Sequence, residues 1–152
     1  MLSIRTCNVY DLLSMHQCNS INLPENYNLK YYFYHAMSWP SLSQIAEDCS
    51  GKICGYTLGK LEEENEKKAH LTSVAVLKNY RKQKLAYYLI TLTHQYVNDI
   101  YNVDNISLHV RVSNMAAINL YYNMLNYKVK EIEHLYYGNK EDAYMMEHLF
   151  NK

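Results

Sequence analysis

The spacing of apolar and polar residues predicts seven strands and four helices along the 152-residue chain. Period-two alternation marks the strands, as in residues 2–7, and amphipathic i, i+3, i+4 spacing marks the helices, as in residues 84–101. In chain order, the predicted elements are strand 2–7, helices 9–19 and 28–37, strands 42–49, 52–61 and 69–77, helix 84–101, strand 106–111, helix 114–125, and strands 127–135 and 142–150. This order favours an α/β fold, a mixed sheet with helices on both faces.

Turn and cap residues support these boundaries. Asn8 and Asn114 each precede a helical stretch and can cap it, whereas Pro24 interrupts helical spacing. The pair Ser50–Gly51 separates two strands and predicts an antiparallel hairpin.

Composition limits the class of protein. The chain is 49% apolar and has only four Gly and two Pro, which excludes a disordered or collagen-like chain and leaves one domain spanning residues 1–152. Fifteen basic residues balance 15 acidic ones, so no global positive field favours direct binding of nucleic acid. No apolar run approaches the roughly 20 residues that a membrane span needs, so no membrane partner is expected.

Cysteine and histidine spacing argues against a metal site. The four cysteines, at 7, 18, 49 and 54, show no C-x-x-C pair, and no secretory signal precedes them, so we expect reduced thiols in a cytoplasmic protein. No two of the seven histidines are spaced i, i+4, and we therefore expect no required metal.

The strongest local signal is a strand that runs into a basic loop and then into a helix, over residues 74–86. A helix N-terminus next to Arg81, Lys82 and Lys84 could bind a pyrophosphate through backbone N–H groups. A solvated basic turn, or a short patch that binds nucleic acid, is the alternative for these residues.

The hexapeptide Arg81-Lys82-Gln83-Lys84-Leu85-Ala86 resembles the R-x-x-G-x-A loop of the GNAT acetyltransferase superfamily. In that family, backbone amides of this loop hold the pyrophosphate of acetyl-coenzyme A (acetyl-CoA). Lys84 stands where the family has Gly. A negative φ at Lys84 would tolerate the side chain, whereas a positive φ would weaken cofactor binding.

Longer segments resemble the catalytic subunits of eukaryotic N-terminal acetyltransferase A complexes, in the same order and over nearly the whole chain. These segments are Leu23-Pro24-Glu25-Asn26-Tyr27, residues 30–35, 38–40, 45–48 and 107–111, Ser113-Asn114 and Glu141-Asp142-Ala143-Tyr144. The resemblance implies a GNAT fold with a mostly antiparallel seven-stranded sheet that is splayed between its fourth and fifth strands. It also implies direct acetyl transfer from acetyl-CoA to the N-terminus of a nascent chain, an auxiliary scaffold subunit, and through that subunit the ribosome.

The resemblance assigns catalysis to three residues, and each also has an ordinary structural explanation. Glu25 would act as a base through a water, although a loop carboxylate is also a common solvated group or helix cap. His109 would be a second base, and its strand directs it away from the face of Leu108 and Val110, although a lone strand histidine is often structural. Tyr121 would protonate the departing thiolate, although a tyrosine on an amphipathic helix is usually a packing residue.

The remaining implied roles concern binding. The residues implied for the cofactor are Val74, Ala75, Val76, Arg81, Lys82, Gln83, Lys84, Leu85, Ala86, Asn114 and Tyr121. Those implied for the peptide are Leu23, Pro24, Glu25, Tyr27, His70, Arg111, Tyr136 and Tyr137, with His70 also a weaker candidate base. Two rival functions share this fold: an acetyltransferase for lysine or small amines, and a binding subunit that has lost catalysis.

Overall fold

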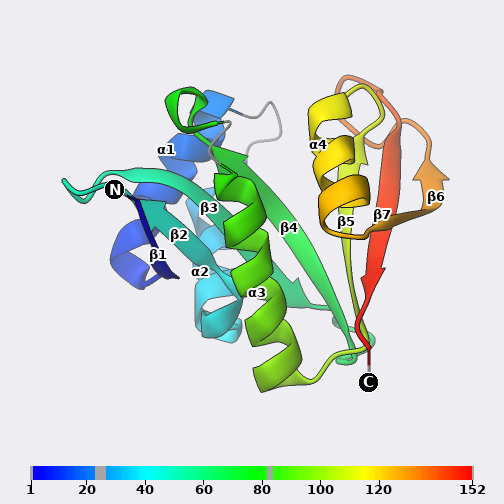
Figure 1. Ribbon diagram of the computed structural model, residues 1–152, viewed down its shortest axis with the longest axis horizontal. Helices are drawn as coiled ribbons and strands as arrows, with labels where there is room; N and C mark the ends of the chain where they lie inside the picture. Colours follow the sequence, from blue (N-terminus) through cyan, green and yellow to red (C-terminus); the bar gives the residue numbers. More distant parts are fainter. Residues whose placement is uncertain (1, 23–26, 82–83, 152) are drawn as a thin grey trace.

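A seven-stranded sheet forms the centre of the computed structural model, which describes residues 2–22, 27–81 and 84–151 (Figure 1). The strands are β1 (Ser3–Thr6), β2 (Gln44–Glu47), β3 (Ile53–Leu61), β4 (Lys68–Val76), β5 (Asn105–Arg111), β6 (Lys128–Glu133) and β7 (Ala143–Leu149). Their order in the sheet is β1-β2-β3-β4-β5-β7-β6. Among the strands of the described residues, only β4 and β5 pair in parallel, so the predicted mixed and mostly antiparallel sheet is confirmed.

In the described part of the chain, four α-helices cover the two faces of this sheet, as predicted. They are α1 (Leu12–Asn22), α2 (Leu29–Ser38), α3 (Leu85–Tyr101) and α4 (Met115–Asn119). Side chains of α1 and α2, including Met15 and Tyr32, pack with Tyr56 on one face. Those of α3, including Ile90, pack with Leu108 on the other face, where the segment after α4 joins them.

Several predicted boundaries are wrong for identifiable reasons. The helix predicted over 9–19 begins as a 3₁₀ turn, Val9–Asp11, whose capping box joins Asn8 and Asp11, and α1 then continues to Asn22. The strand predicted over 42–49 is shorter, because Pro40–Leu42 forms a 3₁₀ turn. The α-helix predicted up to residue 125 becomes a π-helical turn over Leu120–Met124, as i→i+5 bonding replaces i→i+4.

A β-bulge at Thr72 ends the pairing between β4 and β5. Leu58 pairs with Ser73 and Gly59 pairs with Leu71, which leaves Thr72 as an extra residue on β4. The last residue pair of β4 with β5 is Leu71 with Leu108. A bulge bends its strand and increases the local twist, and Figure 1 shows β4 and β5 diverging toward the end of the molecule where α3 begins. The predicted splay between the fourth and fifth strands is therefore confirmed.

The bulge also reverses which face the following side chains cover. Before it, Ala69 and Leu71 are buried in the core that α3 covers. After it, Val74 packs against that core and Val76 packs with Leu85 of α3, whereas Ala75 is buried on the face of α1 and α2.

Among the described helices, none is long and apolar enough to cross a bilayer.

Gly59 lies opposite the bulge, where a side chain would have no room. A Cβ atom added at Gly59 would lie 2.6 Å from the backbone oxygen of Leu42, closer than any ordinary contact. Only glycine, which has no Cβ atom, therefore allows the backbone of β3 to pass this close to Leu42.

We predict that Gly59→Ala lowers the free energy of unfolding by about 1–3 kcal/mol, because the added methyl group must displace a backbone carbonyl. Urea denaturation measures this loss. The matched control is Gly138→Ala, since a Cβ atom at Gly138 meets nothing within 4 Å, and it should stay within about 0.5 kcal/mol of the parent. Equal stabilities for the two variants would contradict the steric argument.

Candidate active site

A cleft of about 650 Å³ occupies the gap between the diverging strands. Residues of β4 and β5, the segment from α4 to its π-helical turn, and the loop after β6 line this cleft. The predicted site residues that line it are Tyr27, His70, Val74, His109, Arg111, Asn114, Tyr121, Tyr136 and Tyr137. The structure thus brings together residues that are spread over more than 100 positions of the sequence. Leu23, Pro24, Glu25, Lys82 and Gln83 lie outside the described residues.

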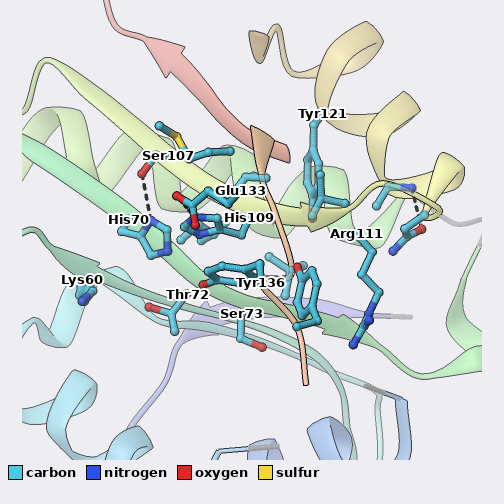
Figure 2. Close-up of a pocket in the computed structure, with 18 of the residues that line it drawn as sticks. Lys60, His70, Thr72, Ser73, Ser107, His109, Arg111, Tyr121, Glu133 and Tyr136 are labelled. Carbon is cyan, nitrogen blue, oxygen red and sulfur yellow. Dashed lines mark hydrogen bonds and ion pairs between the residues drawn. The ribbon is translucent and has the colours of Figure 1, made fainter. Parts of the chain in front are cut away.

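Alternation along β5 directs His109 into the cleft. Leu108 and Val110 are buried in the core beside α3, so His109 lies on the opposite face of the strand, as predicted (Figure 2). Its Nε2 atom lies 3.2 Å from Oε1 of Glu133, and the Tyr136 ring stacks on its imidazole with centroids 4.4 Å apart. Neither ring nitrogen of His109 makes a hydrogen bond to another described group. The imidazole is therefore held by stacking on Tyr136 and by the nearby Glu133 carboxylate, with both of its ring nitrogens buried.

His70 faces the same space from β4 but has a different chemical character. Its ring centroid lies 5.2 Å from that of His109, and its Nδ1 atom is 2.9 Å from Oγ of Ser107. Burial, together with the charge of His109, lowers the pKa of His70 to about 3. His70 is therefore neutral near pH 7, and it is a poorer proton acceptor than an imidazole of ordinary pKa.

Tyr121 enters the cleft from the other face of the sheet. It belongs to the π-helical turn, and its ring packs with Val110 and Tyr127 in the core that α3 covers. Burial raises the pKa of its hydroxyl to about 12, so the group stays protonated at neutral pH. Tyr121 and His109 thus approach the gap from opposite faces of the sheet (Figure 2).

The loop between β6 and β7 closes the side of the cleft next to His109. Arg111 lies over the Tyr137 ring at 4.0 Å, and its guanidinium is 3.3 Å from a carboxylate oxygen of Glu141. Glu141 also accepts a hydrogen bond from the backbone N–H of Ser113. These contacts fix Tyr137 beside the end of β5, next to Tyr136.

The predicted cofactor residues fall into two groups. Asn114 caps α4 by accepting a hydrogen bond from the N–H of Ala117, and it lines the cleft together with Val74. By contrast, the side chains of Ala75, Val76 and Leu85 are buried in the core. Only the backbone of these three residues is therefore suited to contact a ligand.

The basic loop begins where β4 ends. The Nε atom of Arg81 donates a hydrogen bond to the carbonyl of Val76, which attaches the loop to the end of the strand. Lys84 immediately precedes α3 with φ 55° and ψ 24°, a left-handed conformation, and Ala86 packs behind it against the core. The unfavourable alternative anticipated from the sequence, a positive φ at Lys84, is the one found.

Sequence reasoning missed Glu133, Ser107 and Thr72 as cleft residues. Glu133 is 24 positions from His109, so no local spacing connects the two. Thr72 reaches His35 of α2, whose Nε2 atom lies 2.8 Å from Oγ1 of Thr72, and burial lowers the pKa of His35 to about 4. Period-two alternation of β5 places Ser107 on the same face of the strand as His109, so the sequence could have identified Ser107.

Within the described parts of the chain, no group of three His, Cys, Asp or Glu side chains could hold a metal ion.

Comparison with known proteins agrees with this geometry. Residues 11–127 match the model of the acetyltransferase (GNAT) family. The chain is 50% identical over 147 residues to the N-terminal acetyltransferase A complex catalytic subunit of Arabidopsis thaliana, covering 96% of this chain and 77% of the relative. It is 48% identical over 146 residues to an N-terminal acetyltransferase complex ARD1 subunit homolog of Dictyostelium discoideum, covering 96% and 72%.

A solved structure shares the architecture as well. Chaetomium thermophilum Naa20, crystallised in complex with a bisubstrate analogue, superposes with a TM-score of 0.84 at 31% identity, covering 97% of this chain and 86% of that one. The chain therefore belongs to the GNAT acetyltransferase family, and within it to the N-terminal acetyltransferases.

Proposed function

We propose that this chain moves the acetyl group of acetyl-CoA onto the α-amino group of a polypeptide, in the gap between β4 and β5. The observation that carries the proposal is the approach of His109 and Tyr121 to this gap from opposite faces of the sheet. A peptide on the His109 face and a thioester on the Tyr121 face would meet between the strands. The relatives named above support the α-amino group as acceptor, because they are named as N-terminal acetyltransferase subunits.

The first step is loss of a proton from the α-ammonium group, whose pKa is about 7.7–8.0. His109 is the proposed acceptor of this proton, since it lines the cleft and Glu133 lies 3.2 Å from its Nε2 atom to stabilise the imidazolium. Glu25 is a second proposed base, on its resemblance to the family alone. The neutral His70 lies beside His109 and forms a hydrogen bond with Ser107, so we propose a binding role for it rather than the role of a base.

The free amine then attacks the thioester carbonyl directly. The new C–N bond forms as the C–S bond breaks, and the electron pair of that bond leaves with the coenzyme A sulfur. The Tyr121 hydroxyl, kept protonated by burial, supplies a proton to the departing thiolate. No acyl-enzyme is required, and three of the four cysteines, Cys7, Cys18 and Cys54, are buried.

The edge that β4 presents to the gap is the proposed binding site for the pantetheine arm of acetyl-CoA. Pairing with β5 ends at Leu71, so the backbone of Val74, Ala75 and Val76 can accept an added strand-like ligand. Asn114 would contact the same arm. The amides that begin α3, with Arg81, Lys82, Gln83, Lys84, Leu85 and Ala86, would hold the pyrophosphate.

The peptide would bind on the opposite side of the gap. Tyr27, Tyr136 and Tyr137 supply aromatic walls, and Arg111 fixes Tyr137. Leu23 and Pro24, which lie outside the described residues, are proposed to contact the peptide on the resemblance alone. We further propose that residues 1–152 form one domain that acts in the cytoplasm with an auxiliary scaffold subunit, which would bring it to the ribosome.

The acceptor is tested with two peptides of one sequence that contains an internal lysine. One peptide has a free N-terminus and the other is N-terminally blocked. We expect acetylation of the first at its α-amino group and little reaction of the second, as judged by mass spectrometry of fragments. Equal modification of the lysine in both peptides would instead identify a lysine acetyltransferase, and absence of acetyl-CoA binding by folded protein would identify a binding subunit.

Tyr121→Phe should lower kcat by about 100-fold while leaving KM for acetyl-CoA nearly unchanged, because it removes a proton donor that acts only as the C–S bond breaks. Steady-state kinetics with a saturating peptide measures both constants. An unchanged kcat would remove the acid role from Tyr121.

Lys84→Gly should raise the free energy of unfolding by up to about 1 kcal/mol, because glycine adopts the left-handed conformation without a Cβ clash. Lys84→Ala is the matched control, since it also removes the charge but keeps the Cβ atom. We expect the glycine variant to be more stable than the alanine variant and to bind acetyl-CoA more tightly in calorimetry. If the two variants match in both measurements, the backbone at Lys84 does not limit cofactor binding.

A further inference from the structure

A buried hydrogen bond between Tyr127 and His94 lies behind the turn that carries Tyr121. The Tyr127 Oη and His94 Nε2 atoms are 2.7 Å apart, and the Tyr127 side chain is completely buried. His94 projects from α3, whereas Tyr127 lies just before β6. The bond therefore joins the helix that covers β4 to the segment that covers β5, across the splayed part of the sheet.

Tyr127 is also attached directly to Tyr121. The backbone N–H of Tyr127 donates a hydrogen bond to the carbonyl of Tyr121 at 2.8 Å, and the two rings pack with centroids 5.7 Å apart. In the same turn, the N–H of Leu125 donates to the carbonyl of Leu120, the i→i+5 bond of the π-helical turn. Any movement of Tyr127 is therefore transmitted to the backbone and the ring of Tyr121.

Aromatic neighbours hold His94 in place. The His148 ring of β7 stacks on it at 4.9 Å with an angle of 18° between the planes, and Phe150 contacts both imidazoles edge-on. Burial, with a smaller effect of His148, lowers the pKa of His94 to about 3. His94 is thus neutral near pH 7, and its bond to the Tyr127 hydroxyl joins two uncharged groups that the interior can accommodate.

We propose that Tyr127 and His94 are positioning residues, whose hydrogen bond fixes the π-helical turn so that the Tyr121 hydroxyl faces the gap between β4 and β5. This inference rests on the proposed acid role of Tyr121. A π-helical turn is much rarer than an α-helical one and often occurs at functional sites, and the Tyr127–His94 contact holds this one from behind. Catalysis is sensitive to displacements of about 1 Å, which makes a buried anchor behind the acid consequential.

The test is a double-mutant cycle on kcat. Tyr127→Phe keeps the ring and removes only the hydroxyl, and it should lower kcat by roughly three- to tenfold with KM for acetyl-CoA unchanged, the effect expected for one neutral hydrogen bond. In the Tyr121→Phe background, the same change should have no further effect on kcat. A hydroxyl that only supports general stability would lower kcat by the same factor in both backgrounds.

Two further variants complete the design. His94→Phe removes the other partner of the bond and should match Tyr127→Phe, so the test survives if either variant fails to fold. Tyr101→Phe is the matched control: Tyr101 also lies on α3 and bonds the Ser41 backbone, but it does not line the cleft, so kcat should not change. Thermal unfolding of each variant verifies that the folded protein is assayed.

Each outcome has one meaning. An unchanged kcat in Tyr127→Phe and His94→Phe, or losses that persist in the Tyr121→Phe background, overturns the positioning role and leaves the proposed function intact. An unchanged kcat in Tyr121→Phe itself overturns the acid role and the positioning role together.

Discussion

The loss of pairing between β4 and β5 is the constraint on which the rest of the site depends. One extra residue, Thr72, bends β4 just after Leu71 pairs with Leu108. Beyond this pair, the backbone N–H and C=O groups of β4 and β5 do not form hydrogen bonds with each other. Leaving such groups without partners in the interior is costly, so water or a ligand must bind them. Opposite the bulge, β3 approaches the Leu42 backbone so closely that only glycine fits at position 59.

The same bend divides the chemistry between the two faces of the sheet. At the gap, the face toward α1 and α2 carries His70 and His109, with His109 beside Glu133. On the face toward α3, Tyr121 is buried among mostly apolar side chains, with the His94–Tyr127 hydrogen bond behind it. The proposed base, His109, and the proposed acid, Tyr121, thus lie in separate environments, one beside a carboxylate and one among mostly apolar side chains.

Residue patterns predicted most of the fold but only part of the site. Alternation along β5 was sufficient to direct His109 away from Val110, because a strand has a fixed period of two. The pairing of His109 with Glu133, and of His94 with Tyr127, could not be predicted, since 24 and 33 residues separate the partners and only the tertiary fold brings them together. The π-helical turn at Tyr121 escaped prediction because its sequence fits an ordinary amphipathic helix. The left-handed Lys84 was anticipated only as one of two possibilities, since lysine itself disfavours that conformation.

The most direct measurement is amide hydrogen exchange of residues 72–76 and 109–111 with and without saturating coenzyme A. If the open edge of the sheet receives the pantetheine arm, amides that face the gap should exchange more slowly in the complex, because they acquire hydrogen-bond acceptors. Calorimetry on the same sample establishes that the ligand is bound. Bound ligand with unchanged exchange in both strands would contradict the account, because the gap would then not be where acetyl-CoA lies.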